Sequence, residues 1–347
     1  MNVTSTRSIL SIAAAVLVPA ALAPSAHAHH SMSEYDRSVT TEFEGEVVQL
    51  SWTNPHVLLW VETPDENGEP VVWELEGSAV SAQRRRGVMG GEVNVGDQVR
   101  VAGWPSVVRP EHMQVTNVLL PDGVELLVGG AREPRWADSA VGGERNLVDP
   151  AKAAAATGDG IFRVWSQGTG AWYFTGRSDY ELTESAAAAK AGWDDIEDNP
   201  IMQCVPPGMP GLMGNPYPME FTQRDGYIEL RFEEFDALRT IHMEDAGDPA
   251  DMPFSHMGYS VGHWEGDTLV VRTTRINWDY FDRQGAPMTT DVVVDERFTV
   301  VEDGNRLNYL MTVTDPAILV RPFVWDAHFI WRRGEEVNLY DCTLEYQ

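Results

Sequence analysis

Two adjacent histidines, His29 and His30, are the residues that most directly suggest chemistry. The segment before them, residues 1–28, carries one positive charge, an apolar run and a small-residue end, which is the layout of a secretory signal peptide. Cleavage after Ala28 would make His29 the new N-terminus, and its amino group and imidazole would form a chelating pair. Imidazole suits copper, nickel and zinc, so the pattern predicts a metal site with copper as the candidate cofactor.

Such a site needs a further ligand from the folded chain. His56, just after an Asn-Pro turn, is the first candidate, and His112 is the second. Cleavage after Ala26 would instead place His29 third, where the amino group and two backbone amides could complete a square-planar site. The competing interpretation is a plain leader beside the cleavage site, because no Cys or His cluster with ordinary ligand spacing accompanies these histidines.

Charged residues on otherwise apolar strands of the second half suggest acid and base chemistry. His242 and His328 are the candidate proton-transfer groups, and Asp236 or Asp326 would orient them. This chemistry requires a cavity that holds the groups together. The alternative is that strand alternation turns Asp326 and His328 outward, away from any interior.

A second set of residues from the same strands would bind a small apolar or aromatic ligand. Its members are Arg239, Trp325, Glu296 and Arg297, because a few charged groups among aromatic side chains orient a ligand in an apolar pocket. His242-Met243, His256-Met257 and His263 lie within 22 positions of one another and together offer imidazole and thioether groups. That combination favours copper, although methionine also fills irregular cores.

The two cysteines, Cys204 and Cys342, predict a disulfide. An oxidising compartment favours the bond, and the pair lacks the C-x-x-C spacing of redox sites. We expect it to tie the start of the C-terminal domain to its last strand.

The elements that would carry these residues are mostly β-strands. Residues 39–128 predict five strands with a short helix between the third and the fourth, which is the order of an OB-type barrel. Residues 129–160 are rich in Gly, Ala, Pro and charge without a sustained period, which is typical of a linker. The predicted organisation is a signal peptide over 1–28, an OB-like barrel over 29–128, a linker over 129–160 and a larger β domain over 161–347.

Strands with a clear two-residue period dominate the second domain. Tyr309 and Met311 share one face of a strand, and Trp325 and Phe329 share one face of the next. Short turns join neighbouring strands, as in meanders and up-and-down barrels. We therefore predict a mainly β fold in which the second domain is an antiparallel barrel or sandwich with a lipocalin-like meander.

Several segments resemble a known group of proteins. They read HHSMSEYD, EFEGEVVQLSWTNPHVLLWVE, CVPPGMPGLMGNPYPMEF, RTIHM, MGYSVGHWEGDTLVV and MTVTDP. Through them the sequence is similar to a family of uncharacterised exported proteins of Gram-negative bacteria, classed as a domain of unknown function. The resemblance implies an envelope location and no particular activity.

Composition argues against two classes of partner. The formal net charge is −28, with 53 acidic residues against 25 Lys and Arg. Nucleic acids and anionic lipid surfaces are bound through clustered cations, so neither is expected here. After the signal peptide no apolar run reaches the roughly 20 residues of a membrane span, so no membrane insertion is expected.

Together these features predict a periplasmic or secreted protein that binds a small apolar or aromatic ligand in its C-terminal barrel. One alternative is a copper-binding protein that acts through His29, His30 and His56. Another is a barrel enzyme, such as a lyase, isomerase or hydratase, that uses acid and base groups on a hydrophobic substrate.

Overall fold

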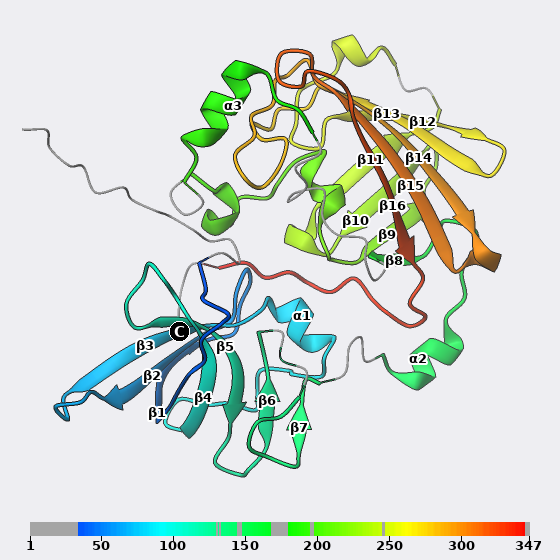
Figure 1. Cartoon of the computed structure of the whole chain (residues 1–347). Coiled ribbons are helices and arrows are strands. Elements are labelled where there is room, and N and C mark those ends of the chain that lie inside the picture. Colours follow the sequence, from blue (N-terminus) through cyan, green and yellow to red (C-terminus); the bar gives the residue numbers. More distant parts are fainter. Residues whose placement is uncertain are drawn as a thin grey trace, which may run out of the picture.

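Two β-barrels follow one another along the chain and lie one above the other in Figure 1. The computed structural model describes residues 34–343 apart from 130, 132, 144–147, 168–179, 195–197 and 245–246. The predicted signal peptide over 1–28 and the candidate ligands His29 and His30 lie outside the described residues. The predicted fold class, a small barrel followed by a larger one, is confirmed.

Five strands form the first barrel. They are β1 (Thr41–Ser51), β2 (Leu58–Pro64), β3 (Pro70–Glu76), β4 (Gln98–Pro105) and β5 (His112–Leu119). The strands pair in the order β3-β2-β1-β4-β5, and a parallel pairing of β3 with β5 closes the barrel. The short helix α1 (Val80–Arg84) lies between β3 and β4, as the OB-type order predicts.

The first part of the predicted linker is bound to the first barrel. β6 (Glu125–Leu127), just before the predicted linker, pairs with β5, and β7 (Ala140–Val141), within the linker, pairs in parallel with β6. The buried carboxylate of Glu125 accepts hydrogen bonds from the backbone N–H groups of residues 135–137. Because a buried carboxylate needs such donors, these bonds hold the segment in place before α2 (Pro150–Ala155) begins.

Nine strands form the second barrel in the described part of the chain. They are β8 (Val164–Gln167), β9 (Met219–Gln223), β10 (Tyr227–Phe232), β11 (Leu238–His242), β12 (Tyr259–Glu265), β13 (Thr268–Thr274), β14 (Val293–Val301), β15 (Arg306–Thr314) and β16 (Phe323–Ile330). The closed order is β10-β11-β12-β13-β14-β15-β16-β8-β9. Neighbouring strands are antiparallel except β11 and β12, which pair in parallel at Ile241 and His242.

Loops between these strands carry the remaining helices. They are α3 (Glu184–Ala191) and the 3₁₀ helices η1 (Pro200–Gln203), η2 (Gly211–Gly214), η3 (Glu234–Asp236), η4 (Pro249–Asp251) and η5 (Glu302–Gly304). Thr183 caps α3, because its hydroxyl accepts a hydrogen bond from the N–H of Ala186. Among the described residues no helix has the length and apolar character to cross a membrane.

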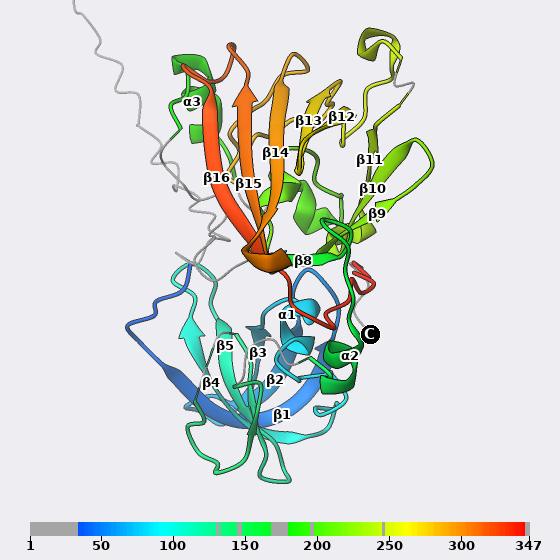
Figure 2. The ribbon, with the colours of Figure 1, turned by 90° about the vertical axis from the view of Figure 1, so that its right-hand side faces the viewer.

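The C-terminal tail, residues 331–343, leaves the second barrel and runs between the two domains (Figures 1 and 2). The side-chain amide of Asn54, in the first domain, donates a hydrogen bond to the carbonyl of Tyr340, and Asn54 forms a β-bridge with Cys342. The predicted disulfide between Cys204 and Cys342 is confirmed, with Cα atoms 5.8 Å apart. The disulfide joins Cys204, the residue after η1, to the tail, whereas the sequence predicted a tie to the last strand.

Candidate functional site at the domain junction

The four candidate acid and base residues are spread over the second barrel. His242 lies on the outer face of β11, and His328 and Asp326 lie on the outer face of β16. Strands β10, β9 and β8 separate β11 from β16 around the barrel. Asp236 lies in η3 and accepts a hydrogen bond from the backbone N–H of Tyr340 in the tail. Partial burial lowers the pKa of both histidines.

Three of the four predicted ligand-binding residues meet inside the second barrel. The guanidinium of Arg239 donates to both carboxylate oxygens of Glu296, with Nη1 3.0 Å from Oε1. The hydroxyl of Tyr309 donates to the same carboxylate at 2.8 Å, and the ring of Trp325 packs on Tyr309 with centroids 5.6 Å apart. Arg297, the next residue along β14, is exposed on the outer face.

This interior network is satisfied by the barrel itself. The Nε of Arg239 donates to Ser260 at 3.0 Å, and its Nη2 donates to Thr273 at 2.7 Å. Burial and the neighbouring Glu296 charge raise the pKa of Tyr309, so the phenol stays a neutral donor. A buried ion pair is tolerated when such bonds satisfy its remaining donors and acceptors. Side chains therefore occupy the part of the interior where the sequence predicted a ligand.

A cavity of about 170 Å³ lies instead at the junction of the two domains. We call it the junction pocket. Its lining residues are Thr53, Asn54, Pro55, His56, Leu58, Glu74, Glu76, Arg109, Met202 and Thr343. Most of them belong to the first barrel, whereas Met202 comes from η1 and Thr343 from the tail. Small-molecule sites occur preferentially at such domain interfaces.

His56 is held in the junction pocket by a carboxylate. Its Nδ1 lies 3.0 Å from Oε1 of Glu76, at the end of β3. Partial burial opposes protonation, but the charge of Glu76 and its hydrogen bond prevail and raise the pKa of His56. The side chain is 39% exposed, and the described part of the chain offers no partner to Nε2. That nitrogen would donate to a ligand when protonated and bind a metal or accept a proton when neutral.

Charged side chains continue from His56 into the first barrel. Arg109 donates to both carboxylate oxygens of Glu34, at 2.6 and 3.1 Å, and its Nη2 lies 3.7 Å from Oε2 of Glu76. With Glu74, whose Oε1 is 3.6 Å from Arg109, this cluster sets three carboxylates against Arg109 and His56. The local charge therefore favours a neutral or cationic ligand over an anion.

His112, the other histidine of this cluster, is already engaged by protein groups. Its Nδ1 lies 3.2 Å from Oε1 of Glu74, and its Nε2 lies 2.9 Å from the hydroxyl of Tyr35. The side chain is 3% exposed, so an added ligand does not reach it. Within the described residues no group of three or more His, Cys, Asp or Glu side chains could hold a metal ion. A metal at His56 would therefore need ligands from outside these residues.

Sequence reasoning identified His56 but not the acidic residues that hold it. Glu74 and Glu76 alternate along β3, a strand whose other residues are largely apolar. In an OB-type barrel β3 pairs with β5, and this pairing sets Glu74 opposite His112. Two carboxylates at alternate positions, combined with the predicted barrel order, were the signal that could have located the cluster.

Comparison with known protein families gives a match for the first domain. Residues 17–111 match the family described as "Family of unknown function (DUF6152)". The predicted resemblance to an uncharacterised family is thus confirmed. The DUF6152 segment includes His56, Glu74, Glu76 and Arg109 but ends before the second barrel begins. A search of the curated proteins found no match to the chain.

Proposed function

We propose that the protein is an exported binding protein that holds a small ligand in the junction pocket, with His56 as the polar anchor. The supporting observation is the histidine whose Nδ1 is held by Glu76 and whose Nε2 has no partner in the described chain. A side chain already fixed in one orientation loses little entropy when it binds a ligand. The export part of the proposal depends on the predicted signal peptide.

The lining of the junction pocket suggests the class of ligand. Leu58 and Met202 offer an apolar wall, and Glu74 and Arg109 lie on the polar side with His56. The cavity, at about 170 Å³, is smaller than the sites of drug-sized molecules, which run from about 300 Å³ upward. We infer a small neutral molecule with one polar group toward His56 and an apolar part against Leu58 and Met202.

Metal binding is a second candidate function that the same histidine favours. A carboxylate bonded to one ring nitrogen is the arrangement that orients metal-bound histidines through the other nitrogen. Glu34, the first described residue, is separated from His56 by the side chains of Arg109 and Glu76. His29 and His30 precede Glu34 by five and four residues, and five residues of extended chain span at most about 17 Å. Copper is the candidate metal.

Native mass spectrometry on the exported protein, purified without chelator, tests both functions. The first predicts an organic adduct that is absent from His56→Ala, since losing one hydrogen bond weakens binding about tenfold. The second predicts one bound copper after titration with copper(II), lost in both His29→Ala and His56→Ala. His328→Ala is the control, because His328 lies on the outer face of β16 and outside the lining of the junction pocket. A bare wild-type mass that also fails to take up copper would contradict both functions.

A further inference from the structure

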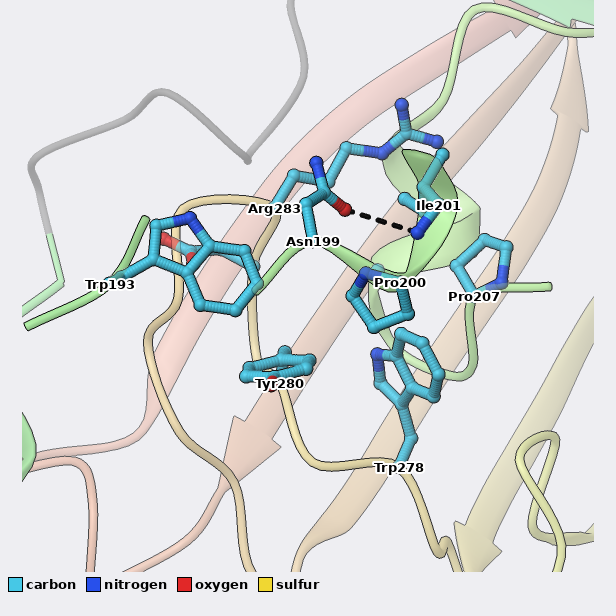
Figure 3. A pocket seen from close by; sticks show the side chains of 10 residues that line it. Trp193, Asn199, Pro200, Ile201, Pro207, Trp278, Tyr280 and Arg283 are labelled. Atoms are coloured by element: carbon cyan, nitrogen blue, oxygen red, sulfur yellow. Dashed lines mark hydrogen bonds between the residues drawn. The ribbon is translucent and has the colours of Figure 1, made fainter. Parts of the chain in front are cut away.

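A second, smaller pocket also borders η1, and aromatic and proline side chains make up half of its lining (Figure 3). We call it the aromatic pocket. Its rings are Trp193, Trp278 and Tyr280. The other lining residues are Asn199, Pro200, Ile201, Pro207, Gly211, Asp282 and Arg283. The enclosed space is about 10 Å³, room for about one water molecule. A ligand would therefore lie at the mouth, against the rings.

The three rings form an angled surface. The centroid of Tyr280 is 4.7 Å from that of Trp193 and 5.8 Å from that of Trp278. The two tryptophan planes are inclined to the tyrosine plane by 69° and 80°. Rings set at such angles present more than one face to a compact group placed among them (Figure 3).

Both tryptophans rest directly on glycine backbone. A Cβ atom at Gly285 would lie 2.3 Å from Cγ of Trp193, and one at Gly208 would lie 2.6 Å from Cβ of Trp278. Any larger residue would displace the indole rings, because atoms do not approach so closely. The two rings are therefore held in place before a ligand arrives, which reduces the entropy lost on binding.

The surroundings of the aromatic pocket carry negative charge from carboxylates. Burial and the carboxylates of Asp279 and Asp198 raise the pKa of Tyr280. Arg283, the cationic residue in the lining, is bonded to the buried carboxylate of Glu234. Its charge is therefore neutralised within the protein.

Several other aromatic rings are covered by cations of the chain itself. The guanidinium of Arg37 lies 4.9 Å from the ring centroid of Trp104, for example. Over Trp278 and Tyr280, in contrast, the described residues place no Lys or Arg. Both rings are half-buried, and the ring of His256 packs against Trp278 with centroids 5.0 Å apart, so part of each ring faces solution.

We propose that the aromatic pocket binds the quaternary ammonium group of a small cationic ligand. The faces of Trp and Tyr attract such cations through their ring quadrupoles, most strongly when several rings surround the charge. Asp279 and Asp198 add direct charge attraction. The aromatic pocket shares no lining residue with the junction pocket, so a negative result for one proposal does not contradict the other.

Calorimetric titration of the full exported chain with choline tests this proposal. The matched probe is 3,3-dimethylbutan-1-ol, which has the same shape without the charge. We expect saturable choline binding and at least about tenfold weaker binding of the uncharged probe. Trp278→Ala should weaken choline binding about tenfold, and Asp279→Asn, at an exposed position, should weaken it severalfold.

The control variant is Trp264→Ala, since Trp264 is 42% exposed on β12 and lies outside the lining of the aromatic pocket. It should bind choline as the wild type does. Failure of choline to saturate the protein would overturn the proposal. Equal affinity for the uncharged probe would also overturn it, because the pocket would then select apolar volume and not charge. Binding of glucose in place of choline would assign the rings to carbohydrate instead.

Discussion

His56 and His112 lie in one charged cluster, and their different surroundings decide which of them can bind a ligand. Both are single histidines in strand-rich sequence, and the sequence offered both as ligands. His112 has protein partners on both ring nitrogens, whereas His56 keeps Nε2 without a partner in the described chain. Such a difference depends on residues far apart in the sequence, such as Tyr35 and Glu76, and no local pattern contains it.

The Glu76 carboxylate should control the protonation of His56. In Glu76→Gln the charge that favours the imidazolium is lost, so we expect the pKa of His56 to fall to or below its ordinary value of about 6.5. An NMR titration of the imidazole signals measures it. Glu265→Gln, next to the exposed His263, should leave the His56 midpoint where it is. An unchanged His56 midpoint in Glu76→Gln would contradict the conclusion that Glu76 raises the pKa of His56.

The contact between His56 and Glu76 also has a defined effect on the free energy of unfolding. The pKa of His56 is raised on folding, so protonated His56 stabilises the folded state. This contribution to stability is fully present below about pH 6.5 and is lost as pH rises through the pKa of His56 in the folded protein. The difference in unfolding free energy between wild type and His56→Gln should therefore shrink as pH increases across this window. Urea unfolding at several pH values measures it, and a difference that grows with pH would have the wrong sign.

At the scale of the elements, the inward faces of the strands were predictable and their polar contacts were not. The two-residue period of β15 and β16 correctly places Tyr309 and Trp325 on an inward face, since both are buried. It also allows Arg239 and Glu296 to face inward. It cannot show that they meet, because β11 and β14 are not neighbours in the barrel and their contact depends on its closure.

The Arg239 and Glu296 pair should be costly to break. Glu296→Gln leaves the guanidinium of Arg239 buried without its counter-charge, and we expect a loss of about 3–5 kcal/mol of unfolding free energy. Adding Arg239→Met to that variant should restore part of the loss, because the two residues are coupled. Denaturant unfolding of the single and double variants measures both effects.

Arg297→Gln is the matched control for this pair. Arg297 follows Glu296 directly but donates to Glu265 on the exposed outer face, so its removal should cost at most about 1 kcal/mol. If Glu296→Gln were as mild as Arg297→Gln, the buried pair would not stabilise the barrel as described.

At the scale of the whole molecule, the two barrels were predictable and the way they are joined was not. Hydrophobic periodicity reveals strands, and strand order indicated an OB-type barrel. The tail and the predicted linker lack periodicity, yet Glu125 binds residues 135–137 and Asn54 binds Tyr340. Contacts of this kind link residues distant in sequence through single hydrogen bonds, which leave no repeating pattern. The junction pocket was missed for that reason.

The disulfide should stabilise the junction as well as the fold. Cys204→Ser with Cys342→Ser should lower the unfolding free energy by about 2–5 kcal/mol, because a long closed loop restricts the unfolded chain. We also expect faster proteolysis of the tail, since its tie to η1 is lost. Thermal unfolding and limited digestion measure the two effects, and adding reductant to the variant should change neither. A variant as stable and as resistant as the wild type would contradict this role.

The position of the tail also sets the order in which the two barrels and the junction pocket form. Chains generally fold domain by domain from the N-terminus as they are made, and here the tail follows both barrels. Both barrels can be complete while the junction pocket still lacks Thr343 and the oxidised Cys204–Cys342 bond beside it. The junction pocket is thus completed after the two barrels, and a newly made or reduced chain would be folded but would have an incomplete pocket.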